Sequence, residues 1–302
     1  MKNSEFIQKC IRHLLAFWRN VTSPIIFTIQ KLIPDSIYLQ RRYKKVMGKK
    51  LNLNPPITFN EKLNWMKLYD RNPIYTRLAD KYSAREYVKE KIGDEYLVPL
   101  LGVWDTVQDI KIDSLPNSFV LKCTHDSGSY IICKDKASFN LDEAKKKLQK
   151  ALKTNYFYYS REWAYKNIKP RIIAEKYLED LNDRETRDYK FFLFDGEPRF
   201  FYIATDRGIG QTKFDFYDMN FEHLNVRQHY PNASKELHAP KNFNKMVELA
   251  RVLASGLRHV RVDFYEVNGK IYFSEFTFYN NGGITAFEPD DWDYRFGEWM
   301  KI

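Results

Sequence analysis

The segment that most constrains the fold spans residues 259–277, HVRVDFYEVNGKIYFSEFT. Two runs rich in β-branched and aromatic residues flank Asn268-Gly269, a pair typical of a hairpin turn. Asp263 lies on the first predicted strand and Glu275 on the second. Because side chains alternate between the two faces of a strand, the length of the turn decides whether these carboxylates share a face.

The turn leaves two arrangements open. A two-residue Asn-Gly turn pairs Asp263 with Ser274 and sends Glu275 to the opposite face, whereas a three-residue loop with Gly269 in the left-handed conformation keeps both carboxylates together. We predict the three-residue loop, and with it a pair of carboxylates able to bind magnesium beside a nucleotide. The alternative is an ordinary amphipathic hairpin whose acidic side chains point into water.

A second hairpin-like segment is FVLKCTHDSGSYIICKDK, residues 119–136. Two apolar runs flank a short polar turn that contains Ser127, Gly128 and Ser129. Gly128 allows the backbone to approach an anion closely, exposed N–H groups can point at phosphate oxygens, and Lys122 supplies a cation. The pattern predicts a loop that covers phosphate groups. Its structural alternative is a plain hairpin turn with a solvated lysine.

Two further segments predict the remainder of a nucleotide site. In IKPRIIAEKYLED, residues 168–180, an apolar strand runs into a short stretch whose backbone suits the edge of a purine and whose side chains suit its faces. In DYKFFLFDGEPRFFYIATDR, residues 188–207, a hairpin is predicted with Asp195-Gly196 at its turn and Lys190 as a second phosphate cation. The candidate adenine residues are Glu175, Lys176, Tyr177 and Leu178.

The order of these segments resembles the ATP-grasp superfamily. More narrowly, the chain from about residue 34 to residue 292 is similar to the teichuronopeptide-biosynthesis (TupA-like) ATP-grasp proteins, which are found in gene clusters for capsule and cell-surface polysaccharides. The stretches that carry the resemblance are TFNEKLNWMKLYDRNP, LADKYSAREYVKEKIGDEYLVPLLGVWD, FVLKCTHDSGSYIICKDK, REWAYKNIKPRIIAEKYL and RVDFYEVNGKIYFSEFTF.

This resemblance implies an α+β fold in which two subdomains grip ATP after a mainly helical N-terminal region. We expect a basic extension at 1–33, a helical domain at 34–116 and an ATP-grasp domain at 117–302, divided at 185/186. The implied cofactors are ATP and Mg²⁺, with two metal ions expected. The implied site residues are Lys122 and Lys190 at the phosphates, Ser127, Gly128 and Ser129 in the loop that covers them, residues 175–178 at the adenine, and Asp263 and Glu275 at the metal.

Two departures from the family pattern leave roles open. The superfamily commonly ends its metal motif with Glu-x-Asn, and here the third position is Thr277, whose hydroxyl is a poorer magnesium ligand than an amide oxygen. The third ligand is therefore Thr277, Asn280 or Asn281. The phosphate loop has one glycine and is preceded by His125, which contacts phosphate, contacts substrate or is simply structural.

The chemistry that the resemblance implies is activation of a carboxylate by ATP, followed by attack of an amine to form an amide. Lys190 and the metal would stabilise the charge on the transferring phosphate. Arg261 shares a strand face with Asp263 and is the candidate for holding the acyl phosphate oxyanion, the alternative being an ion pair with a neighbouring acid. The expected substrates are a sugar acid of the uronic acid type and an amine such as an amino acid. Candidate substrate residues are Arg161, Asp206, Arg207, Gly282 and Gly283.

The net charge of +10 is concentrated at the N-terminus. Residues 1–50 contain eleven Lys and Arg against two acidic residues, and the other residues contain 38 basic and 37 acidic ones. The body of the chain thus has no basic footprint for a nucleic acid, and none is expected as a partner. Apolar residues recur at helical spacing in the extension, at Ile7, Ile11, Leu14, Leu15 and Trp18. This basic amphipathic helix contacts a membrane surface or a capsule-assembly partner, or packs on the protein itself.

Composition favours a cytoplasmic enzyme. No apolar run reaches the roughly eighteen residues that a membrane-spanning helix needs, the N-terminus lacks a signal-peptide pattern, and the three cysteines show no paired spacing. We expect a cytoplasmic location, with contact at the inner face of the membrane as a further option. The rival function is a glycosyltransferase that uses a nucleotide sugar, because Asp291-Trp292-Asp293 has the Asp-x-Asp spacing of a metal site for such donors.

Overall fold

A computed structural model describes residues 31–180, 186–207, 210–234 and 237–302 of the chain. The chain forms two compact units, Met1–Lys50 and Leu51–Ile302. In the first unit, helix α2 (Asp35–Met47) ends at Gly48, whose φ of 72° is left-handed. The amphipathic helix predicted around residues 7–18 lies outside the described residues. No helix of the described ranges is both long and apolar enough to span a membrane.

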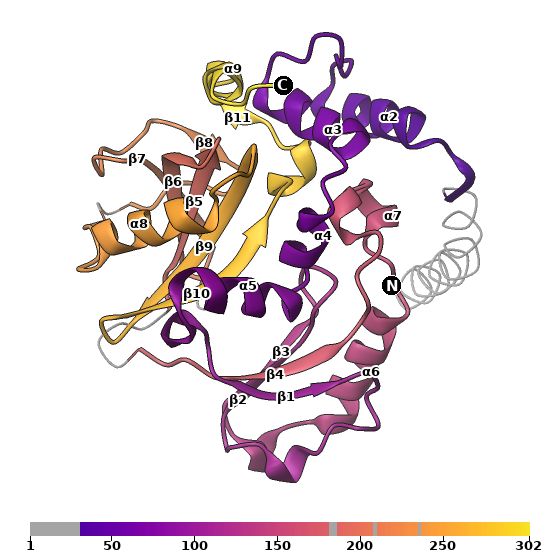
Figure 1. Cartoon of the computed structure of the whole chain (residues 1–302), viewed down its shortest axis with the longest axis vertical. Coiled ribbons are helices and arrows are strands. Elements are labelled where there is room, and N and C mark those ends of the chain that lie inside the picture. The colour runs from indigo at the N-terminus through magenta and orange to yellow at the C-terminus, as the bar shows by residue number, and fades with distance from the viewer. Residues whose placement is uncertain (1–30, 181–185, 208–209, 235–236) are drawn as a thin grey trace, which may run out of the picture. The chain divides into compact units, whose positions relative to one another are not determined.

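The second unit is built on two antiparallel sheets (Figure 1). The first sheet has the order β1-β4-β2-β3, and the second has the order β10-β9-β5-β6-β7. The strands of the first are β1 (Leu100–Trp104), β2 (Phe119–Cys123), β3 (Tyr130–Cys133) and β4 (Ile172–Lys176). Those of the second are β5 (Asp188–Phe194), β6 (Glu197–Thr205), β7 (Lys213–Asp218), β9 (His259–Val267) and β10 (Lys270–Thr277). A separate short pair joins β8 (Arg227–Gln228) to β11 (Phe287–Glu288).

The first sheet begins before the predicted domain boundary at residue 116. Strand β1 pairs with β4 from Leu100 to Trp104, so the stretch expected to belong to the helical region supplies an edge of the first sheet. Sequence alone gave no sign of this, because the partner strand lies about seventy residues further along the chain. The hairpin predicted at Asp195-Gly196 is present, and both of these residues have positive φ.

Helices pack around and between the two sheets of the second unit (Figure 1). They are α3 (Phe59–Tyr69), α4 (Ile74–Ala79), α5 (Ser83–Ile92), α6 (Leu141–Leu152), α7 (Phe157–Ser160), α8 (Phe243–Leu253) and α9 (Asp291–Glu298). Helix α3 starts with a capping box, in which Thr58 and Glu61 satisfy each other's backbone N–H groups. Helix α8 packs the buried side chains of Met246 and Leu253 against the second sheet.

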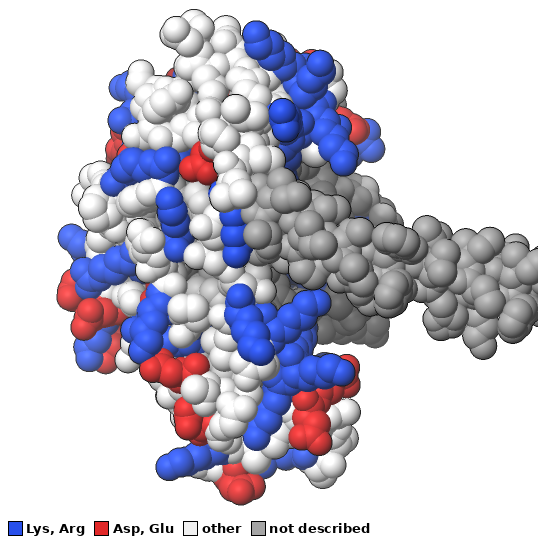
Figure 2. Space-filling model, turned by 90° about the vertical axis from the view of Figure 1, so that its right-hand side faces the viewer, with Lys and Arg blue, Asp and Glu red and all other residues white. Residues whose placement is uncertain are grey.

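Helix α6 is amphipathic. Ala144 and Leu148 are buried, Leu148 within the core of the first sheet, whereas Lys146, Lys147 and Lys150 are exposed. Figure 2 shows the face that carries this helix, and its basic side chains are interspersed with acidic ones. A mixed surface of this kind is typical of a solvated helix face.

The core of the second sheet is strongly aromatic and contains a buried histidine. His259 is fully buried and stacks on Phe194, with 4.7 Å between the ring centroids, while Phe59 meets it edge-on. Its Nδ1 donates to Leu193 O at 2.9 Å, since a carbonyl can only accept. Burial lowers the pKa of His259 to about 3. The ring is therefore neutral in the folded protein at physiological pH.

Acidification is expected to destabilise the protein through His259. The pKa is lower in the folded state than its ordinary value of 6.5, so the stabilising contribution is complete above pH 6.5 and falls as the pH drops below it. At about pH 5 the loss is about 2 kcal/mol. Urea unfolding at about pH 7.5 and about pH 5 should show a loss larger by this amount in the wild type than in His259→Phe. An equal loss in both proteins would contradict the assignment.

Candidate active site

The central hairpin is present, but its turn differs from the prediction. Lys270 pairs with Val267, so the turn has two residues, and both Asn268 (φ 52°) and Gly269 (φ 74°) are left-handed. The predicted three-residue loop is therefore wrong. Two consecutive left-handed residues make the turn whose twist matches that of the flanking strands.

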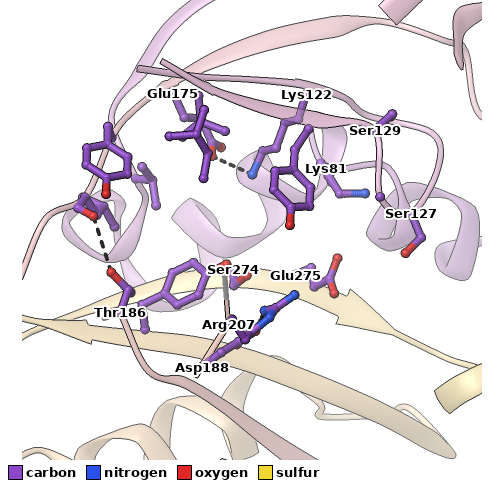
Figure 3. Close-up of a pocket in the computed structure, with 18 of the residues that line it drawn as sticks. Lys81, Lys122, Ser127, Ser129, Glu175, Thr186, Asp188, Arg207, Ser274 and Glu275 are labelled. Atoms are coloured by element: carbon purple, nitrogen blue, oxygen red, sulfur yellow. Dashed lines mark hydrogen bonds and ion pairs between the residues drawn. The ribbon is translucent and has the colours of Figure 1, made fainter. Parts of the chain in front are cut away.

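A β-bulge restores the pairing of the two carboxylates. The register shifts between Phe273 and Glu275, so Ser274 is an extra residue and Glu275 lies directly opposite Asp263. Bulges redirect side chains locally, and both Ser274 and Glu275 line the cavity (Figure 3). The expected juxtaposition is thus achieved by a different device, one that has no marker in the sequence.

An open cavity of about 570 Å³ lies between the two sheets. The first sheet and its glycine loop form one wall, and β5, β9 and β10 form the opposite wall (Figure 3). Gly128, at the centre of the loop, has a φ of 91°, a conformation that favours glycine. The predicted site residues that line the cavity are Lys122, Ser127, Gly128, Ser129, Glu175, Lys176, Tyr177, Leu178, Arg207 and Glu275.

The wall formed by the first sheet carries paired charges. Lys122 Nζ lies 2.6 Å from one oxygen of Glu175, and Arg85 Nη1 lies 3.1 Å from the other. Arg85 also donates to Val98 O at 2.8 Å, which ties helix α5 to the sheet. The Glu175 side chain therefore orients Lys122 toward the cavity, and the backbone of the segment that follows Glu175 faces the same space.

The opposite wall carries an alternating row of charges on one face of the second sheet. Lys190 contacts the carboxylates of both Asp188, at 2.6 Å, and Asp263. Arg207 also binds Asp188, at 2.8 Å. Lys190 and Asp263 are buried and do not line the cavity, whereas their neighbours Asp188 and Glu275 do. Burial lowers the pKa of Lys190, but Asp188 and Asp263 outweigh it and raise that pKa above its ordinary value, so the ammonium stays charged.

Arg261 is held by several partners at the end of this row. Its Nε and Nη2 donate to the two oxygens of Asp263, each at 2.7 Å, and Nη2 lies 3.4 Å from Glu275. Nη1 donates to Asn280 Oδ1 at 2.8 Å. The structure thus contains the ion pair that was the alternative role for Arg261, and it also places the guanidinium beside both candidate metal ligands.

Glu275 is ionised under all ordinary conditions. Burial by itself raises the pKa of this half-buried carboxyl. Four nearby cations outweigh that effect and lower the pKa of Glu275 to about 2; in decreasing order of effect they are Lys81, Lys190, Arg261 and Lys122. An ionised carboxylate is the form that binds a metal.

The residues present fit a magnesium ion that also binds phosphate. Asp263 and Glu275 provide facing carboxylates, the oxygen ligands that Mg²⁺ prefers. Within the described ranges, no group of three or more His, Cys, Asp or Glu side chains is arranged to hold a metal ion. Two carboxylates are sufficient where phosphate groups and water supply the other ligands, as is usual for Mg²⁺.

The contacts of the two asparagines bear on which of Thr277, Asn280 and Asn281 could be the third protein ligand. Both polar atoms of the Asn280 side chain are engaged, the oxygen by Arg261 and the nitrogen by Gln228 at 2.9 Å. Asn281 donates to Gln228 at 3.0 Å. Thr277 lies two residues after Glu275 on the same strand and therefore faces the same side.

Several predicted residues do not line the cavity in the described part of the chain. His125 is buried, and its Nε2 donates to Ala151 O at 3.1 Å, on helix α6. Arg161 is also buried, with its guanidinium 5.3 Å from the ring centre of Tyr158. The others are Asp206, whose carbonyl accepts from Gly210 N, Gly282 and Gly283, which lie against helix α3, and Lys190, Arg261, Asp263 and Thr277, which lie on strands of the second sheet.

Lys81 and Arg85 are site residues that the sequence pattern missed. Lys81 lines the cavity, donates to Asp126 O in the glycine loop and is the first of the cations that lower the pKa of Glu275. Its backbone N–H bonds to Thr124 O at the end of β2, which fixes it beside the loop. The segment reads locally as the start of a helix, so only the long-range contact with β2 reveals the role of Lys81.

Replacing Lys81 with Met is expected to weaken ATP binding about tenfold. The change removes one cavity cation and the contact that holds the glycine loop, a charged hydrogen bond of about 1.5–3 kcal/mol. Calorimetric titration with ATP and magnesium measures the effect, and Lys89→Met, an exposed lysine on the neighbouring helix, is the control. Equal affinity in Lys81→Met and Lys89→Met would show that Lys81 does not contact the nucleotide.

Comparison with known proteins identifies the family. The family model described as TupA-like ATPgrasp matches residues 61–301. The chain belongs to the TupA-like ATP-grasp family. This membership confirms the predicted fold class and the resemblance seen in the sequence. No curated protein matches the chain.

Solved structures of ATP-grasp ligases resemble this member of the TupA-like family at low identity. A D-alanine–D-alanine ligase from Bacillus anthracis complexed with ATP is 14% identical over 67% of this chain and 53% of its own, with a TM-score of 0.39. The N5-carboxyaminoimidazole synthetase of Staphylococcus aureus is 15% identical over 66% and 44%, with a TM-score of 0.33. The ATP-grasp ligase PsnB, complexed with a minimal precursor, is 9% identical over 72% and 59%, with a TM-score of 0.40. The chain thus spans about half the length of these proteins.

Proposed function

We propose that this protein is an ATP- and magnesium-dependent ligase that joins a carboxylate to an amine in the biosynthesis of a capsular or cell-surface polysaccharide. The observation that carries the proposal is the pairing of Asp263 with Glu275 on the wall opposite the glycine loop of Gly128. Cations from both walls surround the space between them, and membership of the TupA-like ATP-grasp family supports ATP as the nucleotide.

The reaction has two steps. A carboxylate oxygen of the sugar acid attacks the γ-phosphorus of ATP, the bond to the β-phosphate oxygen breaks, and an acyl phosphate and ADP form. The amine nitrogen then attacks the acyl carbon, inorganic phosphate leaves, and the nitrogen loses a proton to give the amide. Magnesium, when bound, would neutralise phosphate charge, and Asp263 and Glu275 would hold it.

The protein's own residues would align the phosphates and stabilise charge. Lys122 lines the cavity and would contact the phosphate oxygens directly, and Lys190, buried beside Asp188 in the opposite wall, would add positive charge near them. The backbone of the glycine loop would cover the phosphates, and the segment after Glu175 would hold the adenine. Arg261 lies beside both metal carboxylates and would hold the acyl phosphate oxyanion.

Substrates and location are proposed on the family's context. Arg207 lines the cavity and is the predicted substrate residue best placed to pair with a sugar-acid carboxylate. The amine is an amino acid or a similar compound. The enzyme would act in the cytoplasm, where ATP is available, with residues 1–33 as the candidate contact to the membrane or to a capsule-assembly partner. Nucleic acid is not a proposed partner.

The glycosyltransferase alternative finds no support at Asp291-Trp292-Asp293. These residues open helix α9, where Asp291 forms an ion pair with Arg295 at 3.0 Å and Asp293 accepts from Asn60 N at 2.9 Å. Neither carboxylate lines the cavity within the described residues. The two acids thus serve the helix and its neighbour.

A trapping assay tests the ligase proposal. The protein is incubated with ATP, magnesium and a panel of uronic acids, with hydroxylamine as a small amine that converts an acyl phosphate into a hydroxamate, which is detected as its coloured iron(III) complex. ADP and hydroxamate in equal amounts would support the ligase, and amino acids would then replace hydroxylamine. ADP with a stable phosphorylated product would indicate a kinase. Thermal stabilisation by nucleotide sugars but not by ATP would refute the proposal.

A further inference from the structure

We propose that Gln228 is a positioning residue that fixes the Arg261 guanidinium through Asn280. Gln228 Oε1 accepts from Asn280 Nδ2 at 2.9 Å, and Asn280 Oδ1 accepts from Arg261 Nη1 at 2.8 Å. Gln228 is 2% exposed and Asn280 is fully buried. Gln228 lies on β8, a strand for which the sequence predicted no role, and these two hydrogen bonds connect it to the proposed catalytic arginine.

The ends of this chain of hydrogen bonds determine the direction of both amide groups. A guanidinium only donates, so Asn280 must turn its oxygen to Arg261 and its nitrogen to Gln228. At the other end, Gln228 Nε2 donates to the backbone carbonyl of Thr285 at 3.0 Å, and a carbonyl only accepts. Neither amide can flip without losing a bond at each end, which makes the arrangement rigid.

The Asn280 contact is the shorter of two Arg261 contacts that involve no carboxylate, the other being the Tyr202 hydroxyl at 3.4 Å from Nη1. The other strong partner of Arg261 is Asp263, which binds it through two hydrogen bonds but is also a candidate metal ligand. Binding of a metal by that carboxylate would compete with its bonds to the guanidinium. The bond from Nη1 to Asn280 involves no carboxylate, so it would hold the guanidinium in place when a metal is bound.

The loop that carries Asn280 has a second, independent set of anchors on helix α3. Lys67 Nζ donates to Gly282 O at 2.6 Å, Asn64 Nδ2 to Gly283 O at 2.7 Å, and Asn60 Nδ2 to Thr285 O at 3.1 Å. Positions 60, 64 and 67 lie on one face of the helix.

The loop backbone is also constrained by its own conformation. Gly283 has a φ of 60°, and a Cβ atom there would lie 3.0 Å from Leu63 Cβ, so only glycine fits between the loop and the helix. Together with the anchors on α3, this holds the backbone without help from Gln228. Replacing Gln228 should therefore release the Asn280 side chain while the protein still folds.

The test reads the Arg261 guanidinium directly by NMR spectroscopy of protein labelled with ¹⁵N-arginine. The signals of Arg261 are those that Arg261→Lys lacks. A guanidinium held at Nη1 and Nη2 rotates slowly and gives separate Nη signals, so we expect these in the wild type and their merging or broadening in Gln228→Met. Asn280→Leu removes the same contact from the other side and serves as a second variant should Gln228→Met fail to fold.

The control is Glu288→Gln, which alters an exposed carboxylate on β11, the strand paired with β8. It should leave the Arg261 signals unchanged. Unchanged Arg261 signals in Gln228→Met, or in Asn280→Leu if only that variant folds, would overturn the proposal. A merely structural Gln228 would lower the melting temperature without altering these signals.

A double-mutant cycle with Gln228→Met and Arg261→Lys tests the link between these two residues during turnover. This test rests on the proposed function. We expect Gln228→Met to lower kcat for ADP formation about tenfold with KM for ATP within about twofold of the wild type, and to cause no further loss in an Arg261→Lys background. The same loss in both backgrounds would overturn the link. If the wild type forms no ADP with any acceptor, the proposed function fails, while the NMR result still decides the role of Gln228.

Discussion

Replacing Asp263 with Asn is expected to lower the free energy of unfolding by about 3–5 kcal/mol, the usual cost of removing one partner from a buried ion pair. Asp263 is fully buried and is the carboxylate shared by Arg261 and Lys190, so its loss leaves two buried cations short of a counter-charge. Chemical denaturation measures this loss directly.

The same variant should also lose the stabilisation that ATP with magnesium confers. Saturating ligand at about one hundred times its dissociation constant adds about 2.7 kcal/mol to the wild type. Thermal unfolding with ATP, with and without magnesium, separates this effect from the intrinsic destabilisation. A magnesium-dependent shift as large in Asp263→Asn as in the wild type would exclude Asp263 as a metal ligand.

Asp291→Asn is a matched control that also tests the rival function. Its carboxylate is 49% exposed and pairs with Arg295 on the same helix, so its removal should change the free energy of unfolding by less than about 1 kcal/mol. The response to ATP should remain. A loss of nucleotide-sugar binding in this variant would instead favour the glycosyltransferase.

Arg261→Lys is expected to lower turnover about a hundredfold to a thousandfold while ATP affinity changes only a few-fold. Loss of one donor to a developing oxyanion typically has an effect of this size, and a lysine cannot reproduce the fork that binds two oxygens of Asp263 and still reach Asn280. The measurement is ADP formation with a uronic acid and hydroxylamine, alongside calorimetric ATP binding.

The control for this variant makes the same arginine-to-lysine change at a different position, which also conserves the charge. Arg258→Lys alters a partly exposed arginine near the start of β9, where it pairs with Asp70 at 3.3 Å. Its turnover should stay within about twofold of the wild type. If Arg261→Lys behaves in the same way, Arg261 acts as a structural ion-pair partner and not in the chemistry.

The elements of the site could be read from local sequence because each one follows from short-range chemistry. Asn268-Gly269 predicts a hairpin turn, alternation places Asp263 and Arg261 on one strand face, and Gly128 between two apolar runs predicts the loop. The order of these segments was enough for the family resemblance, which the match over residues 61–301 bears out.

Contacts between residues far apart in the chain could not be predicted from the sequence. The turn proved to have two residues, and the bulge at Ser274 set the register, because strand pairing and not loop composition determines where an extra residue is accommodated. Lys81 reaches the glycine loop from a helical segment, and β1 joins its sheet from outside the predicted domain. Both require partners far apart in the chain.

The sequence by itself thus determined which residues are available for the chemistry: the two carboxylates, the strand lysines, the arginine and the glycine loop. The tertiary structure decided which of them act together. It buried Lys190 and Arg261 around Asp263, turned His125 to a carbonyl of α6, and linked Arg261 through Asn280 to Gln228. The physical reason is that charge pairing and hydrogen bonding depend on distances of a few ångströms, and only the packing of the two sheets and their helices sets those distances.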